Sequence, residues 1–285
     1  MIENDANLGF GAGCNVGAAA ASGELLLFLN PDATVEPGFR QAIERPIADG
    51  RGWAAWQGVV TAEGGRIINT RGGVVHFTGI AWAGGAGLRT ADSGLRTGEE
   101  PGFASGACFA IPRARFEEIG GFAEGFFLYH EDVDLSLRLR LAGGRLGVEP
   151  AARVDHDYAF VKGAAKWRGL ERNRWATIVR TYPSALLVAT LPALIATELA
   201  LVAVALAGGW LPQKLASWWD VVRAVPRLAR ERRAIQATRT VSAAEFAAAL
   251  GAELDSPYFG GLARSPALWS VLRAYRRALL AVLGS

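Results

Sequence analysis

The sequence is poor in cysteine and nearly balanced in charge, and each feature excludes a class of protein. Its two cysteines, Cys14 and Cys108, lie far apart and form no Cys-x-x-Cys pair. This spacing predicts neither a zinc site nor a disulfide framework, and it fits a reduced, cytosol-facing compartment. The formal net charge is only +3, so composition gives no argument for a nucleic-acid partner. The first residues, MIENDANLGFGAG, also lack the basic and then apolar run of a secretory signal.

Apolar residues, by contrast, are abundant, at 51% of the chain. The segment Ala185–Ala207 is long enough to cross a bilayer core, which takes about 20 residues, and its only charge is Glu198. Basic residues flank it on both sides, whereas a single span normally has them on one side. Together with Pro192, this favours a kinked or re-entrant helix that returns both flanks to the cytoplasmic face of the membrane. A buried core helix is the alternative.

Strand-like and helix-like segments alternate up to about residue 160, which predicts a layered α/β domain. We expect strands over 25–29, 53–60, 66–70, 103–111, 145–148 and 152–156, and helices over 13–22, 37–48, 112–120 and 131–142. Because Leu25–Leu29 is continuously apolar, we expect that strand to be covered on both faces. Beyond residue 160 the chain is helical, and Ser242 with Glu245 forms a capping box that opens a late helix.

The sequence Asn30-Pro31-Asp32 follows the first predicted strand directly. Open α/β sheets collect their ligands at the carboxyl ends of strands. A carboxylate there can hold a divalent cation, which offsets the charge of a diphosphate leaving group. The alternative is an ordinary turn, because Asn-Pro and Pro-Asp are both turn dipeptides.

A second acidic motif lies about a hundred residues later, in GFFLYHEDVDLSLRLR (125–140). A hydroxyl group that attacks a second substrate needs a base to take its proton, and Glu131-Asp132 at a predicted helix start offers one. Acids that complement the helix N-terminus are the alternative. That alternative accounts for Glu131 and Asp134 but leaves the aromatic lead-in, Phe126–Tyr129, unexplained.

These two motifs together resemble glycosyltransferase family 2, and within it the bacterial rhamnosyltransferase-like members, over roughly residues 4–182. The resemblance implies an A-type nucleotide-sugar fold and metal-dependent inverting transfer with Mg²⁺ or Mn²⁺. Asp132 would be the base, and Glu131 would position the acceptor or tune its neighbour. Asp32 would bind the metal, with Asn30 beside the donor.

Three further segments gain roles from the resemblance. Asn7, Gly9 and Asn15 would contact or shape the donor site, although a glycine-rich turn is the alternative. A dinucleotide fingerprint is disfavoured because Val16 stands where its third glycine should be. Acceptor contacts would come from Ser105 and Gly106, unless they only pack a strand.

A histidine near the metal and diphosphate is a further feature that the resemblance implies. His156 occupies that position, and an ordinary structural histidine is the alternative. His76 and His130 receive no role. The basic and aromatic stretch Lys162–Tyr182 fits either an interfacial helix or one that packs on the catalytic domain.

The predicted domains are a partial catalytic domain (1–160), a connecting helix (161–184), the apolar membrane segment (185–207) and a basic helical tail (208–285). The resemblance implies transfer of a sugar such as rhamnose, from a nucleotide-diphosphate donor to a lipid-linked or cell-envelope glycan. In that family, strand–helix–strand units that grip the base and ribose precede the segment matching Asn7–Phe10. We therefore expect an upstream extension, without which the chain would bind donor weakly. A non-catalytic, membrane-associated interaction protein is the alternative function.

Overall fold

The structure is a computed structural model of the 285-residue chain. It describes every residue except 1, 93, 95–98, 158–162, 257–259, 262, 264 and 285. The predicted boundary at residue 160 and the start of the basic stretch at Lys162 fall outside the described residues.

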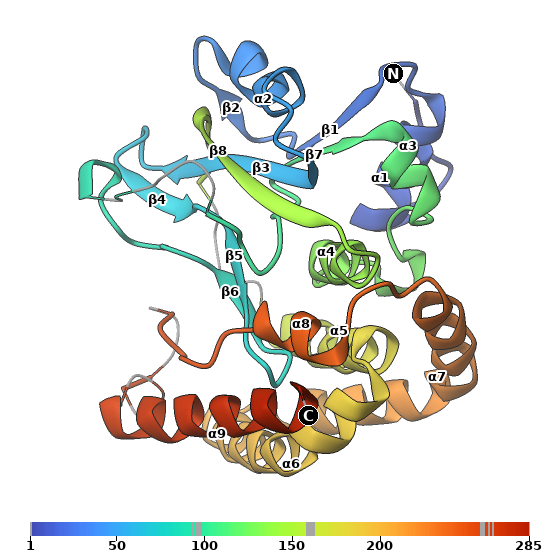
Figure 1. The fold of residues 1–285 in the computed structure, drawn as a ribbon, viewed down its shortest axis with the longest axis vertical. Helices are drawn as coiled ribbons and strands as arrows, with labels where there is room; N and C mark the ends of the chain where they lie inside the picture. The colour runs from blue at the N-terminus through green and yellow to red at the C-terminus, as the bar shows by residue number, and fades with distance from the viewer. Residues whose placement is uncertain are drawn as a thin grey trace.

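A mixed sheet forms the upper half of the molecule in Figure 1. Its strands are β1 (Leu25–Leu29), β2 (Thr34–Val35), β3 (Trp53–Ala62), β4 (Ile67–Thr70), β7 (Cys108–Pro112) and β8 (Arg145–Asp155). The strand order is β1-β7-β3-β8-β2, with β4 paired to β3. The central β3 and β8 are parallel, whereas the other pairs are antiparallel. Two further strands, β5 (Gly73–Val75) and β6 (Ala81–Ala83), form a separate hairpin.

Helices cover both faces of this sheet, which confirms the predicted layered α/β architecture. On one side, α1 (Phe10–Ala20), α3 (Arg113–Glu118) and α4 (Glu131–Leu141) share a core with β1 and β7 that includes Phe28, Phe109 and Leu135. On the other side, α2 (Phe39–Ala48) packs Ile43 against Trp56 of β3. The sheet is therefore held between two helical layers.

Three of the predicted elements differ in the structure. The expectation that β1 is covered on both faces is wrong: it lies at an edge of the sheet, pairs only with β7, and leaves Leu27 40% exposed. The apolar run predicts that residues 25–29 form a strand, but it does not indicate which strands lie beside it in the sheet. The strand predicted from Phe103 begins only at Cys108. The backbone N–H groups of Ala104 and Ser105 donate to the side chains of Ser136 and Gln57 and not to a neighbouring strand. The two strands predicted within 145–156 form one strand, β8.

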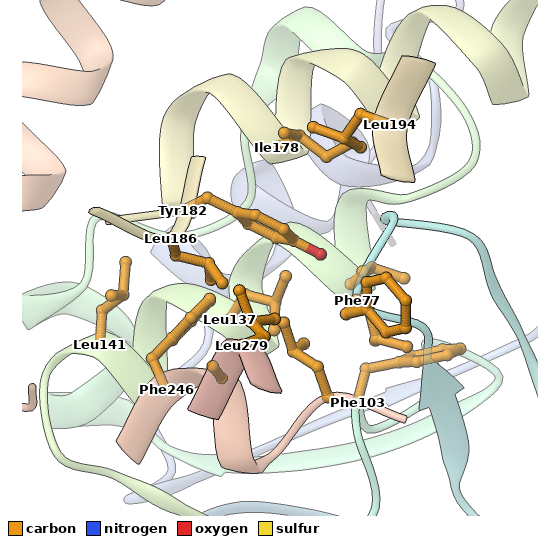
Figure 2. Packing of buried hydrophobic residues seen from close by; sticks show 14 residues of the cluster. Phe77, Phe103, Leu137, Leu141, Ile178, Tyr182, Leu186, Leu194, Phe246 and Leu279 are labelled. Carbon is orange, nitrogen blue, oxygen red and sulfur yellow. The ribbon is translucent and has the colours of Figure 1, made fainter. Parts of the chain in front are cut away.

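The second half of the chain is a helical layer on the far side of α4 from the sheet (Figure 1). It comprises α5 (Ala165–Thr181), α6 (Ser184–Ala207), α7 (Leu211–Ala237), α8 (Ala243–Ala248) and α9 (Pro266–Gly284). Its core joins these helices to α4 and to the β5–β6 hairpin, and Figure 2 shows Leu137 and Leu279 in its middle, with Tyr182 beside them. The capping box opens α8 as predicted, with Ser242 Oγ accepting from Glu245 N at 3.1 Å.

The apolar helix α6 has one charged side chain, and that side chain is bonded inside the protein. Glu198 accepts hydrogen bonds from Arg174 of α5 and Trp218 of α7, and lies 2.7 Å from Lys214 Nζ, also of α7. Within the described residues, α6 alone is long and apolar enough to cross a membrane, and length and composition by themselves are weak evidence for a span. Its outward side chains are strongly exposed: Val188, Leu191, Ile195, Leu199, Val204 and Leu206.

Candidate active site

A short loop, residues 103–107, connects the two predicted acidic motifs. The backbone N–H of Asn30, at the end of β1, donates to Ala107 O at 3.2 Å. The backbone N–H of Gly106 donates to Asp132 Oδ2 at 3.0 Å. Segments that are about a hundred residues apart in the sequence are thus bonded to neighbouring residues of one loop.

Buried polar side chains hold this loop in place. Gln57 of β3 is fully buried and its Oε1 accepts from Ser105 N at 2.8 Å, while Ser136 Oγ of α4 accepts from Ala104 N at 3.1 Å. A Cβ on Gly106 would lie 3.0 Å from the ring of Phe10, so a side chain there would press on α1. Glycine keeps the backbone of the loop close to Asp132.

The predicted metal ligands Asp32 and His156 and the predicted donor-site residue Asn30 come together at the carboxyl end of β1. His156 Nε2 lies 3.0 Å from Asp32 Oδ1 and 3.4 Å from Asn30 Nδ2. His156 is 5% exposed at the side chain and Asp32 is 69% exposed, so the carboxylate extends from a buried imidazole towards solvent. Asn30-Pro31-Asp32 also forms an ordinary turn, in which Ala33 N donates to Asn30 O at 3.1 Å. The turn therefore does not exclude a role for the Asp32 carboxylate beside His156.

The carboxylates on either side of His156 fix its position. Asp155 accepts from the backbone N–H groups of Gly64 and Gly65 at 3.1 and 3.0 Å, and Asp157 accepts from Glu63 N at 2.8 Å. Both therefore fasten the end of β8 to the turn between β3 and β4. With its neighbours engaged in this way, His156 is held facing Asp32.

These residues fit a divalent cation in part. Two cis ligands of an octahedral ion with bonds of about 2.1 Å lie about 3.0 Å apart, as Asp32 Oδ1 and His156 Nε2 do. No group of three or more His, Cys, Asp or Glu side chains with metal-ligand geometry occurs within the described residues. Mg²⁺ and similar ions commonly take only one or two protein carboxylates and complete their shell with water and substrate phosphates.

The acidic pair stands at the start of α4, with Glu131 buried and Asp132 half-buried. Burial is the main cause that raises the pKa of Glu131 to about 8, and the neighbouring Asp132 carboxylate contributes to the same rise. Burial also raises the pKa of Asp132, although the backbone N–H groups of Gly106 and Val133 act against this rise by donating to its two oxygens. The N–H donors of Gly106 and Val133 thus favour the charged form of Asp132, whereas Glu131 Oε2 is buried without a hydrogen-bond partner among the described residues.

The segment that leads into this pair has an unusual backbone. Phe127, Tyr129 and His130 have φ angles of 62°, 73° and 67°, a region that non-glycine residues seldom occupy. Strain of this kind costs of the order of 1–3 kcal/mol per residue and persists only where surrounding bonds impose it. It therefore marks a segment whose shape the rest of the protein enforces.

Asn173 of α5 supplies those bonds. Its buried Nδ2 lies 3.0, 2.8 and 2.7 Å from the carbonyl oxygens of Phe126, Leu128 and Tyr129. Arg172 Nη2 donates to Phe126 O at 2.7 Å. The sequence predicts an interfacial or packing helix for this part of Lys162–Tyr182 and gives it no role at the site. The only signal was its polarity within an otherwise core-packed helix.

The Asn7–Phe10 segment lies against the same strained loop. Phe10 N donates to Phe127 O at 2.8 Å, and a Cβ on Gly9 would come within 2.2 Å of that oxygen. Asn7 Oδ1 accepts from Gly9 N at 3.0 Å, which shapes the turn. Asn15 exchanges two hydrogen bonds with the backbone of Phe122. Contact of these residues with a donor stays a prediction.

Comparison with known proteins supports the resemblance over part of the chain. No family model matches. N-acetylglucosaminyl-diphospho-decaprenol L-rhamnosyltransferase of Mycobacterium tuberculosis is 43% identical over 70 residues, which is 24% of this chain and 23% of that protein. Rhamnosyltransferase WbbL of Escherichia coli K12 is 37% identical over 68 residues, 22% of this chain and 26% of that protein. The matches thus span about a quarter of these relatives, and over that part they confirm the sequence resemblance to glycosyltransferase family 2.

Two solved structures share a broad likeness with the chain. A GalNAc-T7 complex with UDP, GalNAc and Mn²⁺ has a TM-score of 0.49 at 18% identity, covering 66% of this chain and 38% of that one. The mannosyltransferase PcManGT of Pyrobaculum calidifontis, with GDP-Man and Mn²⁺, has a TM-score of 0.41 at 19% identity, covering 98% and 68%. A likeness of this size is too low to assign a function.

Proposed function

We propose that the protein is an inverting glycosyltransferase that takes a sugar from a nucleotide-diphosphate donor. The observation that carries this proposal is the convergence of the two acidic motifs on the loop 103–107, where Asn30 and Asp132 bond adjacent residues. If the first motif were only a turn and the second only a helix start, neither role would require the two to lie close together. A transfer site does require it, because the acceptor hydroxyl attacks the same carbon atom that the diphosphate leaves.

Asp132 is the base in this proposal. As the acceptor oxygen bonds the anomeric carbon, the bond to the diphosphate breaks and the diphosphate leaves with the electron pair. The acceptor proton passes to the Asp132 carboxylate. Its raised pKa makes it a stronger base than an exposed aspartate, while the N–H groups of Gly106 and Val133 stabilise its charged form. A protonated Glu131 avoids a second negative charge beside it.

Asp32 and His156 would hold a divalent cation, Mg²⁺ or Mn²⁺, whose charge offsets that of the departing diphosphate. The 3.0 Å spacing of their ligand atoms supports this assignment. It can be tested without turnover, because Mn²⁺ bound to protein has a distinct electron paramagnetic resonance spectrum. Asp32→Asn and His156→Ala should each weaken Mn²⁺ binding. Glu44→Gln, which removes an exposed carboxylate of α2 paired with Arg40 and not part of the site, should leave Mn²⁺ bound.

The names of the relatives guide the choice of substrates. Both specify rhamnose, and one specifies an N-acetylglucosaminyl-diphospho-decaprenol acceptor. We infer a rhamnose-like donor sugar and a lipid-linked or cell-envelope glycan acceptor. The A-type nucleotide-sugar fold belongs to the same proposal, and the mixed sheet with helices on both faces is compatible with it.

Attachment to the cytoplasmic face of the membrane is also part of the proposal. Val188, Ile195 and Leu199 of α6 are 74%, 54% and 68% exposed, on a face that nothing in the described residues covers. Glu198, on the inner face of the same helix, is tied to α5 and α7. We infer that α6 rests its outer face on the bilayer and stays packed on the protein, without crossing. Carbonate extraction that leaves the protein in the pellet would contradict this.

A direct test is metal-dependent release of nucleoside diphosphate from a panel of nucleotide-rhamnose and related donors by the full-length protein. Release that needs Mg²⁺ or Mn²⁺, and that rises with a polyprenyl-diphosphate glycan, is the expected result. A folded protein that neither binds nor consumes any donor would favour the alternative, a non-catalytic membrane-associated interaction protein.

A further inference from the structure

A small cavity of about 200 Å³ lies between α5, α7 and the 3₁₀ turn Glu124–Phe126. Three arginines line it: Arg172 from α5, and Arg223 and Arg227 from α7. Asp220 is the only acidic residue in its lining. This excess of positive charge distinguishes the cavity from the acidic site of Glu131 and Asp132 at the start of α4.

The acidic groups near the cavity are already engaged. Both Asp220 oxygens accept from Arg168, at 2.7 and 2.8 Å, and Glu231 lies 3.0 Å from Arg227. Among the described residues, neither Arg172 nor Arg223 lies within ion-pair distance of a carboxylate. Within the described part of the chain these two guanidinium groups thus have no carboxylate in an ion pair, although Arg172 donates to Asn173 Oδ1 and Phe126 O.

The pKa of Arg172 also reflects an excess of positive charge around the cavity. Burial lowers its pKa, and the nearby guanidinium groups of Arg227 and Arg168 lower it further, although Asp220 acts in the opposite direction. Arginines that repel one another around a cavity are a common arrangement for phosphate, which guanidinium groups bind in a planar, two-pronged geometry.

The surroundings of the cavity favour a phosphate carried by a lipid over a soluble one. On the outer side of α7, Trp219, Val222 and Val225 are 56%, 58% and 52% exposed. The guanidinium of Arg223 stacks over the Trp219 ring at 4.9 Å. Exposed tryptophan and arginine beside apolar side chains suit the headgroup layer of a bilayer, where one end of a ligand is charged and the other apolar.

We propose that this cavity binds the phosphate or diphosphate group of a membrane lipid, with the lipid chain lying along the outer face of α7. The proposal rests on the proposed function, for which it supplies a place to hold the acceptor's lipid-borne phosphate. Arg172 joins the two regions, since the same guanidinium lines the cavity and bonds Phe126 O ahead of the catalytic pair. A ligand in the cavity would thus contact an arginine that also bonds the segment preceding Asp132.

The test uses the full-length protein and vesicles of phosphatidylcholine, alone or containing either phosphatidylglycerol or a polyprenyl diphosphate. Binding is measured by flotation, with inorganic pyrophosphate in solution as a further probe. Arg223→Gln should weaken binding to the diphosphate-bearing vesicles about fivefold to tenfold, the effect of one guanidinium near a phosphate. Arg233→Gln is the matched control, because Arg233 is exposed on the same helix but does not line the cavity.

The outcomes separate this inference from the proposed function. Selective loss with Arg223→Gln, preference for diphosphate lipid over phosphatidylglycerol, and weak binding of free pyrophosphate would support the cavity. Equal losses in Arg223→Gln and Arg233→Gln would overturn it in favour of general surface charge, and pyrophosphate bound as tightly as the lipid would overturn the lipid assignment. Metal-dependent donor consumption is measured in parallel and should be unchanged by Arg223→Gln. Its absence in the wild type would count against the proposed function alone.

Discussion

Replacing Asn173 with alanine should destabilise the protein and misplace its catalytic pair. The buried Nδ2 group of Asn173 is shared by three carbonyl oxygens, at 2.7 to 3.0 Å. Phe126 O would keep its bond from Arg172, but Leu128 O and Tyr129 O would lose their donor. Both of these bonds are only partly buried, so each lost bond costs about 0.5–1.5 kcal/mol and the expected loss is about 1–3 kcal/mol. Against a total stability of about 5–15 kcal/mol, this loss is large.

The assay is urea denaturation followed by circular dichroism, with donor binding and sugar transfer measured on the same samples. Asn173→Asp preserves the size of the side chain but turns an acceptor oxygen towards the carbonyls, so it should destabilise at least as much as alanine. The strained residues Phe127, Tyr129 and His130 come just before Glu131-Asp132, so relaxing them should displace the base. Transfer should therefore fall while donor binding persists. An Asn173→Ala protein within about 0.5 kcal/mol of the wild type, the range of ordinary surface changes, would refute this reasoning.

Two further predictions follow from buried charge. The pKa of Glu131 is raised from 4.5 to about 8 by burial, so folding takes up a proton between these values and stability falls as pH rises through that window. Glu131→Gln should flatten this decline, by a few kcal/mol at about pH 8, and a pH profile of the denaturation midpoint identical to the wild type would contradict it. Glu198→Leu should leave the buried Arg174 and Lys214 with Glu171 as their remaining carboxylate partner, and cost about 3–5 kcal/mol. If α6 left the protein to cross a bilayer, the same change would instead strengthen membrane insertion without loss of stability.

Much of the fold follows from local sequence pattern. Helix α4 begins at Glu131 and ends one residue before the predicted end, because acids fill its first turn, arginines its last, and glycines stop it. The apolar run predicted β1, and the capping box predicted the start of α8. Each of these signals is contained within one element, so no knowledge of distant residues is needed.

The errors arise where distant residues decide the structure. Leu27 is exposed because of which strands neighbour β1, which the run itself does not encode. Residues 104–107 are small, as in a packed strand, but Ser136 and Gln57 accept from the N–H groups of Ala104 and Ser105 and so draw them away from a strand ladder. The role of Asn173 was hidden for the same reason, since its three partners lie more than forty residues away.

At the site, the sequence motifs selected the residues but not their spacing. The structure places Asn30, Asp32 and His156 together and bonds Asp132 to Gly106, as a common site requires. Ser105 is held by Gln57 through its backbone. The assignments of donor, acceptor and metal contacts to these residues stay predictions, since they depend on bound ligands.

The central claim is that the two acidic motifs form one transfer site with separate duties. It is tested most directly by measuring donor binding and sugar transfer side by side in the full-length wild type, Asp32→Asn and Asp132→Asn, with and without Mn²⁺. We predict that Asp32→Asn abolishes metal-dependent donor binding. Asp132→Asn should bind donor normally and lose about 10²–10⁴-fold in turnover, the usual effect of removing a general base. An Asp132→Asn enzyme that retains more than about a tenth of wild-type turnover, well above that range, would contradict the account.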